Sequence, residues 1–359
     1  MIKIDIYPYI LNFNFSAKTS RGAMKEKKTY FLRVEDNQTC AVGWGECSTI
    51  ENLSVDGMVD YEQLVPKITP GLSGFDYQGE CDIPEALSKV IPAEFPALLM
   101  GLETAFLNLK QGKEGKVFSD TFFNGDQRIP INGLVWMGDV DFMLQQVDEK
   151  IALGFNTIKL KVGGIDFAQE CEILKYIRDS FSVNQITLRL DANGAFSPAE
   201  ALKKLEILSQ YEVHSIEQPL KAGQPEMAEV ISASPVPVAL DEELIGITDG
   251  KTDLLDRLKP HFIVLKPSLH GGFHGCREWI RAMDNVGGGW WITSALESNI
   301  GLNAIAQFVA GYQPVLPQGL GTGKLYENNV SSPLTIAGGG LYYDKSKTWN
   351  LNMMMPYGA

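Results

Sequence analysis

Apolar and polar positions follow two rhythms along the chain, and the change falls near residue 125. Before it, strand-like alternation comes first and helical periodicity second, an order typical of an α+β domain. Residues 16–25 are polar, and we expect them to form a loop with too few apolar anchors to stay rigid. Strands are predicted at Met1–Phe15, Lys28–Val34 and Cys40–Glu46, and helices at Val59–Lys67, Ile83–Ser88 and Phe95–Gln111.

After Gln127, strand and helix candidates alternate strictly. The predicted helices include Asp139–Leu153, Phe167–Phe181 and Gly301–Ala310. Eight strand candidates are enough to close an α/β barrel, and residues beyond about 330 are expected to return and pack on the first domain. The strand candidates are Ile129–Val135, Asn156–Val162, Thr187–Asp191, His214–Glu217, Val236–Asp241, Phe262–Lys266, Trp290–Leu296 and Gln313–Leu320.

Charged residues end most of these barrel strands. Lys159 and Lys161 share one face of their strand because side chains alternate. The later strand ends follow at steps of 24 to 30 residues, which is the length of one βα repeat, and they carry Asp191, Glu217, Asp241 and Lys266. A single acid at a strand end is more often a helix cap or a solvated residue. Six such groups in phase with the repeat instead predict an active site at the C-terminal rim of the barrel.

Three carboxylates on consecutive strands form an oxygen-only ligand set. Asp191, Glu217 and Asp241 therefore predict a hard divalent cation, Mg²⁺ with Mn²⁺ as a substitute. A substrate carboxylate bound there becomes acidic at its α-carbon, because the enediolate is stabilised where its charge develops. Lys161 is the candidate base, since burial, the cation and Lys159 all lower its pKa.

Weaker signals surround this set, and each keeps two interpretations. Asn193 either orients a metal ligand or is a turn residue before glycine. Glu242 either supports Asp241 or is simply exposed. His270 and His274 have helical spacing but are separated by two glycines, and the oxygen ligands already account for the metal, so we do not expect them to be ligands.

Composition excludes several classes of function. Lys and Arg total 31 against 44 Asp and Glu, a net charge of −13, which argues against nucleic-acid binding. The five cysteines form no C-x-x-C pair and favour a reducing cytoplasm. No apolar run approaches the ~18 residues of a membrane span. The predicted site instead makes a small-molecule carboxylate the expected partner. The sequence leaves the oligomeric state open.

Five short motifs together identify a family. Lys159-Leu-Lys161, Asp191-Ala-Asn193, Glu217-Gln-Pro219, Asp241-Glu242 and Lys266-Pro267 resemble the enolase superfamily in its muconate-lactonizing-like branch, and Gly43-Trp-Gly-Glu46 extends the resemblance to the first domain. The resemblance implies a modified TIM-type (β/α)7β barrel over 126–329. It also implies an α+β capping domain over 1–125, completed by the tail 330–359.

Within this branch, Ser294–Leu302 and Gly319–Thr322 most resemble the o-succinylbenzoate synthase family. That likeness implies Mg-dependent syn-dehydration of 2-succinyl-6-hydroxy-2,4-cyclohexadiene-1-carboxylate to 2-succinylbenzoate in menaquinone biosynthesis. It implies that Lys161 removes the α-proton and then helps the hydroxide to depart. It also implies that Lys266 stabilises the anionic intermediate and that Lys159 stabilises the substrate carboxylate. The substrate contacts that it implies are Ser294, Gly319 and, from a lid at 16–25, Ser20 and Arg21.

Three other functions remain open. Dipeptide epimerases and N-acylamino-acid racemases resemble this pattern and use the two lysines as opposed acid and base. The epimerases commonly carry an acid at the last strand, where this chain has Gly319-Leu-Gly-Thr322. A non-catalytic metal-binding barrel is disfavoured because two unpaired pocket lysines would cost stability unless they act.

Overall fold

A three-stranded antiparallel sheet begins the chain and packs against three helices. The computed structural model describes residues 1–19, 22–118 and 121–352. Strand order is β1-β2-β3, formed by β1 (Ile2–Thr19), β2 (Gly22–Asp36) and β3 (Ala41–Ser48). The helices that cover it are α1 (Tyr61–Leu72), α2 (Ile83–Ser88) and α3 (Pro96–Gln111). Alternate residues of β2, such as Leu32 and Val34, are fully buried in the core shared with these helices.

Glycines let β3 lie directly against α3. A Cβ at Gly43 would lie 2.0 Å from the Ala105 carbonyl oxygen, and one at Gly45 would lie 1.9 Å from that of Gly101. Both approaches are closer than real Cβ contacts, so the two glycines of the Gly-Trp-Gly-Glu segment are steric requirements of this packing. The close contact holds β3, and with it the next residue Glu46, against α3.

The predicted loop at 16–25 is wrong, because β1 and β2 continue through most of it as a hairpin. Ala17 pairs with Met24 after an irregularity that begins at Asn12. Backbone hydrogen bonds across the hairpin replace the missing local apolar anchors. The anchors that exist come from afar: the Phe15 ring lies 5.4 Å from that of Trp136, and the Phe13 ring lies 4.7 Å from that of Tyr326. No local sequence pattern contains those partners.

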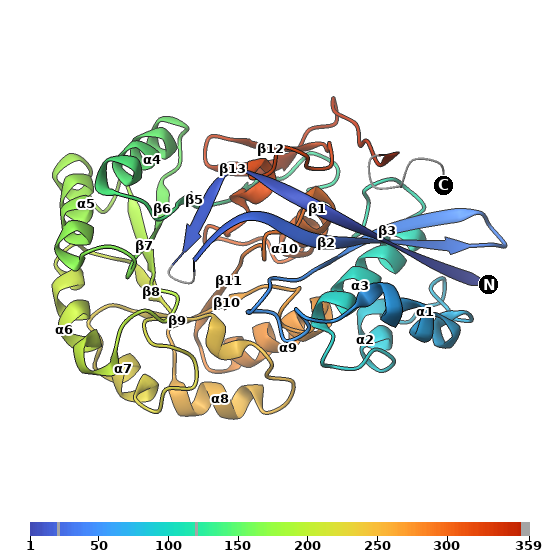
Figure 1. Ribbon diagram of the computed structural model, residues 1–359, viewed down its shortest axis with the longest axis horizontal. Helices are drawn as coiled ribbons and strands as arrows, with labels where there is room; N and C mark the ends of the chain where they lie inside the picture. The colour runs from blue at the N-terminus through green and yellow to red at the C-terminus, as the bar shows by residue number, and fades with distance from the viewer. Residues whose placement is uncertain (20–21, 119–120, 353–359) are drawn as a thin grey trace.

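Seven parallel strands form the second sheet in sequential order, and helices pack around its outside (Figure 1). The strands are β5 (Gly133–Val135), β6 (Thr157–Lys161), β7 (Thr187–Asp191), β8 (Ser215–Glu217), β9 (Val238–Leu240), β10 (Phe262–Leu265) and β11 (Gly289–Ile292). The helices are α4 (Val140–Ala152), α5 (Phe167–Ser180), α6 (Pro198–Ser209), α7 (Met227–Ala233), α8 (Lys251–Leu258), α9 (Gly272–Asn285) and α10 (Asn299–Ala310), with short 3-10 turns at Glu242–Leu244 and Gly321–Lys324. Within the described ranges, no helix has both the length and the apolar character required to cross a membrane.

The predicted eighth strand at 313–320 is wrong as a strand, although the segment does join the two edges of the sheet. Single bridges pair Gln318 with Ile131 and Gly319 with Thr293. Pro314 and Pro317 have no N–H to donate, which prevents a continuous ladder. The Gln318 side chain adds a bond by accepting the N–H of Ile292 at 2.7 Å. The barrel is therefore closed by individual contacts rather than by an eighth ladder.

The predicted strand at 129–135 is divided, and its first part pairs with the tail. β4 (Ile129–Pro130) forms a separate sheet with β12 (Leu334–Ala337) and β13 (Gly340–Tyr343). The tail hairpin thus pairs with the segment that leads into the first barrel strand rather than with the first sheet. Further along the tail, Trp349 shares a buried cluster with Phe31 of β2.

Glu46 links the first sheet to the barrel. Its carboxylate accepts hydrogen bonds from Thr29 Oγ1 at 2.8 Å and, across the interface, from the Ser298 N–H at 2.9 Å and hydroxyl at 2.5 Å. The Gly301 N–H donates at 2.9 Å. The first turn of α10 leaves N–H groups without helical partners, and a carboxylate complements their partial positive charge. Glu46 therefore caps α10 from another part of the chain.

We expect Glu46→Gln to lower the free energy of unfolding by about 3 kcal/mol, because the variant loses the charge and cannot accept from all four donors. Urea denaturation followed by circular dichroism measures the change. Glu51→Gln, an exposed substitution on the same domain, is the control and should stay within about 0.5 kcal/mol of the unmodified protein. Equal effects of the two substitutions would refute the capping role.

Candidate active site

A cavity of about 770 Å³ lies at the carboxyl ends of the barrel strands and extends to the first domain. Parallel strands bring their carboxyl ends to one rim, so residues distant in sequence meet there. The barrel lines the cavity with Lys159, Lys161, Asp191, Asn193, Glu217, Lys266, Ser294 and Gly319. The first domain contributes Met24, Lys27, Ile50, Leu53 and neighbouring residues. Asp241 lies at the end of the adjacent β9.

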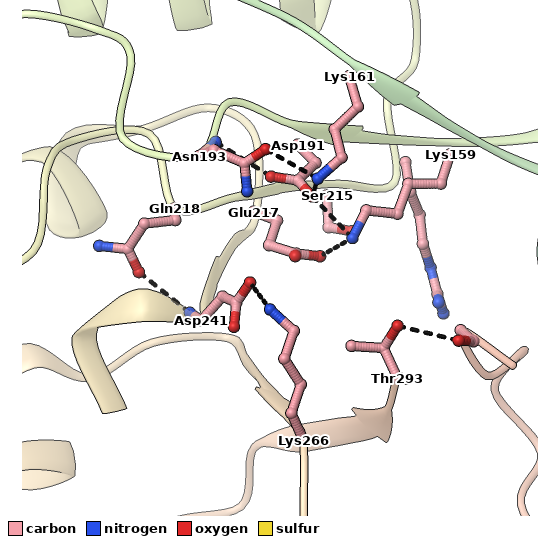
Figure 2. A network of polar contacts seen from close by, with 12 residues as sticks. Lys159, Lys161, Asp191, Asn193, Ser215, Glu217, Gln218, Asp241, Lys266 and Thr293 are labelled. Carbon is pink, nitrogen blue, oxygen red and sulfur yellow. Dashed lines mark hydrogen bonds and ion pairs between the residues drawn. The ribbon is translucent and has the colours of Figure 1, made fainter. Parts of the chain in front are cut away.

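The structure brings the strand-end lysines and acids together in one buried group (Figure 2). Lys159 Nζ lies 2.8 Å from Asp191 Oδ2 and 2.6 Å from Glu217 Oε2. Lys161 Nζ lies 2.6 Å from the same oxygen of Asp191. Parallel registers align Lys161 with Asp191 and Asp191 with Glu217, which explains why these side chains lie level with one another.

Lys266 pairs with Asp241 on the other side of this group. Its ammonium donates to Asp241 Oδ2, and Figure 2 shows it approaching the carboxylates from the side opposite Lys161. Both lysines are almost fully buried. A flat ligand above the carboxylates would therefore have one ammonium group on each side.

Electrostatics distinguish Lys161 from the other two lysines. Burial lowers the pKa of Lys161, and the charge of Lys159 lowers it further, against the attraction of Asp191. For Lys159, burial has the same direction, but Asp191 and Glu217 outweigh it and raise the pKa. For Lys266, burial is outweighed by Asp241, and its pKa is also raised. Lys161 is thus the amine of this group that loses its proton most readily.

The acids match a divalent cation in ligand chemistry. Glu217 Oε1 and Asp241 Oδ1 are buried and have no hydrogen-bond partner among the described residues. An orphaned carboxylate oxygen is costly unless a cation or donor satisfies it. The ammonium groups of Lys159 and Lys266 pair with the second oxygens of Glu217 and Asp241. Among the described residues, no three Asp, Glu, His or Cys side chains converge on one point. The donor types and free oxygens fit a hard cation.

Asn193 contacts both the candidate base and a candidate ligand. Its Oδ1 accepts from Lys161 Nζ at 2.8 Å, and its N–H donates to Asp191 Oδ1 at 3.0 Å. Its Nδ2 donates to Glu242 Oε1 at 3.0 Å. A backbone φ of 45° places Asn193 in the left-handed region that asparagine tolerates. Glu242 therefore orients an amide that in turn orients Lys161.

The predicted substrate contacts divide into two pairs. Ser294 and Gly319 line the cavity, whereas Ser20 and Arg21 lie outside the described residues. Ser294 donates its hydroxyl to Glu297 Oε2 at 2.5 Å. A Cβ at Gly319 would lie 2.1 Å from Thr293 Oγ1, so close approach of these two segments requires glycine at this position.

Sequence reasoning missed three buried polar residues that support the site. Glu297 accepts from Ser268 Oγ at 2.6 Å as well as from Ser294. Gln218 Oε1 accepts the N–H of Asp241 at 3.0 Å and so positions a candidate ligand. Arg189 lies 4.0 Å over the Trp291 ring. Strand alternation places Arg189 on the same face as Asp191, so that signal was available in the sequence.

Comparisons with known proteins agree with this geometry. Residues 143–345 match the family "Enolase C-terminal domain-like". The o-succinylbenzoate synthase of Desulfotalea psychrophila is 43% identical, covering 92% of this chain and 95% of its own. The crystal structure of MenC from Desulfotalea psychrophila LSv54 is 41% identical, with a TM-score of 0.83 over 95% of this chain and 99% of its own.

Two more distant structures share the fold. The muconate lactonizing enzyme from Pseudomonas fluorescens, complexed with muconolactone, is 18% identical, with a TM-score of 0.80 over 98% of each chain. The dipeptide epimerase from Enterococcus faecalis V583, complexed with Mg and the dipeptide L-Leu-L-Tyr, is 21% identical, with a TM-score of 0.80 over 98% of each chain. At these identities the likeness concerns the fold.

The fold and the site define an α/β-barrel enzyme with lysines and acids at the carboxyl ends of its strands. The family match covers more than half of the chain, and the relative from Desulfotalea covers almost all of it. The chain belongs to the enolase superfamily, in its muconate-lactonizing-like branch.

Proposed function

We propose that this chain is an o-succinylbenzoate synthase, a hydro-lyase that dehydrates 2-succinyl-6-hydroxy-2,4-cyclohexadiene-1-carboxylate in menaquinone biosynthesis. Identity of 43% over 92% of the chain to the Desulfotalea enzyme is the observation that carries the proposal. The site supports it because Lys161 and Lys266 approach the buried carboxylates from opposite sides.

Lys161 has the chemistry of the base. In its neutral form the amine removes the proton from the ring carbon that bears the carboxylate, and the C–H electron pair enters the ring. The ammonium then returns the proton to the departing hydroxyl on the same face, so that the C–O bond breaks, water leaves and the ring becomes aromatic. Burial and Lys159 lower the pKa of Lys161 in the direction that this role requires.

The other residues stabilise charge and hold positions. A divalent cation, Mg²⁺ in this proposal with Mn²⁺ as a substitute, would be held by Asp191, Glu217 and Asp241 and would supply positive charge beside the substrate carboxylate. Lys266, which keeps its proton, stabilises the ring anion from the opposite face. Asn193, held by Glu242, orients the Lys161 amine.

We further propose the division of labour between the two parts of the chain. Residues 1–125, joined by the end of the tail at Trp349 rather than by the tail hairpin, act as the capping domain, and 126–329 as the catalytic barrel. Ser294 and Gly319 contact the substrate, a small carboxylate, together with Ser20 and Arg21. The cytoplasm is the proposed location.

The proposal predicts Mg²⁺-dependent dehydration of the cyclohexadiene substrate by the purified protein. An ultraviolet assay measures formation of the aromatic product before chelation, after chelation and after Mg²⁺ is restored. N-acylamino acids and dipeptides, followed by polarimetry, test the two isomerase alternatives. Isomerisation without dehydration would replace the proposal, and no turnover of any of these carboxylates with Mg²⁺ would favour a non-catalytic barrel. The glycines at Gly319 and Gly321 disfavour the dipeptide reaction, since they leave no acid there for an ammonium group.

A further inference from the structure

Lys27 is a buried lysine in the part of the cavity wall that the first domain provides. It is 5% exposed, whereas its neighbours Glu26 and Lys28 are exposed. Alternation along β2 explains the difference, because Lys27 shares a face with Thr29 and Phe31. Phe31 packs with Ile300 of α10, so this face of β2 is turned toward the barrel.

Among the described residues, the one hydrogen-bond partner of the Lys27 ammonium is a neutral group. The ammonium donates to the Ser48 hydroxyl. Among the residues that the structure describes, no carboxylate oxygen lies within the 4.0 Å of an ion pair with Lys27, whereas Lys159, Lys161 and Lys266 all have such partners. An ammonium has three N–H donors, and two of those of Lys27 remain available for a ligand.

Two carboxylates lie farther from Lys27 and are already engaged. Burial lowers the pKa of Lys27, and the charges of Glu46 and Glu297 act against it. Glu46 accepts from Thr29, Ser298 and Gly301, and Glu297 accepts from Ser268 and Ser294. These acids therefore favour a positive charge at Lys27 without occupying its donors, and an arriving carboxylate would favour it further.

The proposed substrate carries two carboxylates, one on the ring and one at the end of the succinyl arm. The barrel residues account for the ring carboxylate, so the arm needs a second cation elsewhere in the cavity. Lys28 lines the cavity too, but it is exposed, lies 3.7 Å from Glu62 and covers the Tyr30 ring at 4.6 Å. Lys150 belongs to the outer helix α4 and lies 5.9 Å over the Phe155 ring. Neither is as deeply buried in the cavity wall as Lys27.

We propose that Lys27 binds the distal carboxylate of the succinyl arm and thereby selects substrates with a second negative charge. This inference rests on the proposed dehydration for the identity of the substrate. It assigns Lys27 to binding rather than to bond breaking, so its contribution is the same in the ground state and the transition state. Loss of Lys27 should consequently appear in KM and leave kcat nearly unchanged.

The test compares Lys27→Met with Lys25→Met, which removes the same charge from an exposed position of β2 outside the cavity lining. Each variant receives the cyclohexadiene substrate and an analogue whose arm ends in a carboxamide. We expect Lys27→Met to raise KM for the acid by about 30-fold or more and KM for the amide by less than about threefold. Lys25→Met should leave both KM values within about twofold. Circular dichroism verifies folding, and Lys27→Gln, which can still donate to Ser48, repeats the comparison if the methionine variant is unfolded.

Calorimetric binding of 2-succinylbenzoate and its arm carboxamide separates this inference from the proposed reaction. Loss of preference for the acid in Lys27→Met supports the carboxylate contact, even if the unmodified protein fails to dehydrate the cyclohexadiene and the proposed function falls. Equal losses for acid and amide, or an unchanged preference, would overturn it. Lys27 would then be only a buried counter-charge for Glu46 and Glu297.

Discussion

Replacing Lys161 with alanine should lower kcat for dehydration by about 10³- to 10⁴-fold, the upper range for loss of a general acid–base group. The amine would both remove the α-proton and return it to the leaving hydroxyl, so its loss affects both steps. Lys266 lies on the opposite side, and its pKa is raised rather than lowered. Continuous ultraviolet measurement of 2-succinylbenzoate formation at saturating substrate and Mg²⁺ gives kcat.

Two comparisons make the loss specific to Lys161. Lys175→Ala removes a lysine from an exposed pair on α5 and should leave kcat unchanged. Lys266→Ala should also reduce kcat, but exchange of the substrate α-proton with deuterated solvent should remain detectable, since Lys161 is present. A Lys161→Ala variant that dehydrates the substrate at the original rate would eliminate the proposed base.

Replacing Asp241 with asparagine should destabilise the metal-free protein by about 3–5 kcal/mol, the usual cost of removing one partner from a buried ion pair. Lys266 has no other ion-pair partner among the described residues, so its ammonium would be left uncompensated. The same substitution removes one proposed ligand and should raise the Mg²⁺ concentration needed for half-maximal activity. Urea denaturation with EDTA and a magnesium titration of activity measure the two effects.

A double variant tests the origin of the destabilisation. Asp241→Asn combined with Lys266→Met leaves no unpaired charge, and it should recover much of the stability lost in the single variant. Additive losses in the double variant would show that Asp241 contributes through its backbone surroundings rather than through the ion pair.

Local patterns were sufficient for the β/α rhythm and for the strand-end residues. The parallel strands β6 to β10 end close to the positions that alternation and repeat length predicted. Because parallel strands share one carboxyl edge, their spacing also predicted that Lys161, Asp191 and Glu217 would meet. Periodicity contains this information since it reflects which face of each strand is buried.

Long-range contacts decided the rest. Hairpin residues near Phe15 are held by Trp136, and Glu46 caps α10 from more than 250 positions away in the chain. The two prolines at 314 and 317 were visible in the sequence, but only the closed barrel shows that side-chain and backbone bonds from Gln318 replace the ladder. Such contacts depend on how separate elements pack, which no local pattern contains.

The sequence by itself determined the barrel class, the lysine and acid set, and the family to which they belong. The sequence already suggested Lys161 as the base, but only the tertiary structure separates it from Lys159, because the two lysines have almost the same sequence context but different neighbours in space, which raise the pKa of Lys159 and leave that of Lys161 lowered. It also decided that Lys27 is buried in the cavity wall while Lys28 is exposed beside Glu62. The physical reason is that burial and charge pairing are properties of the packed molecule, whereas sequence specifies only which groups are available to be paired.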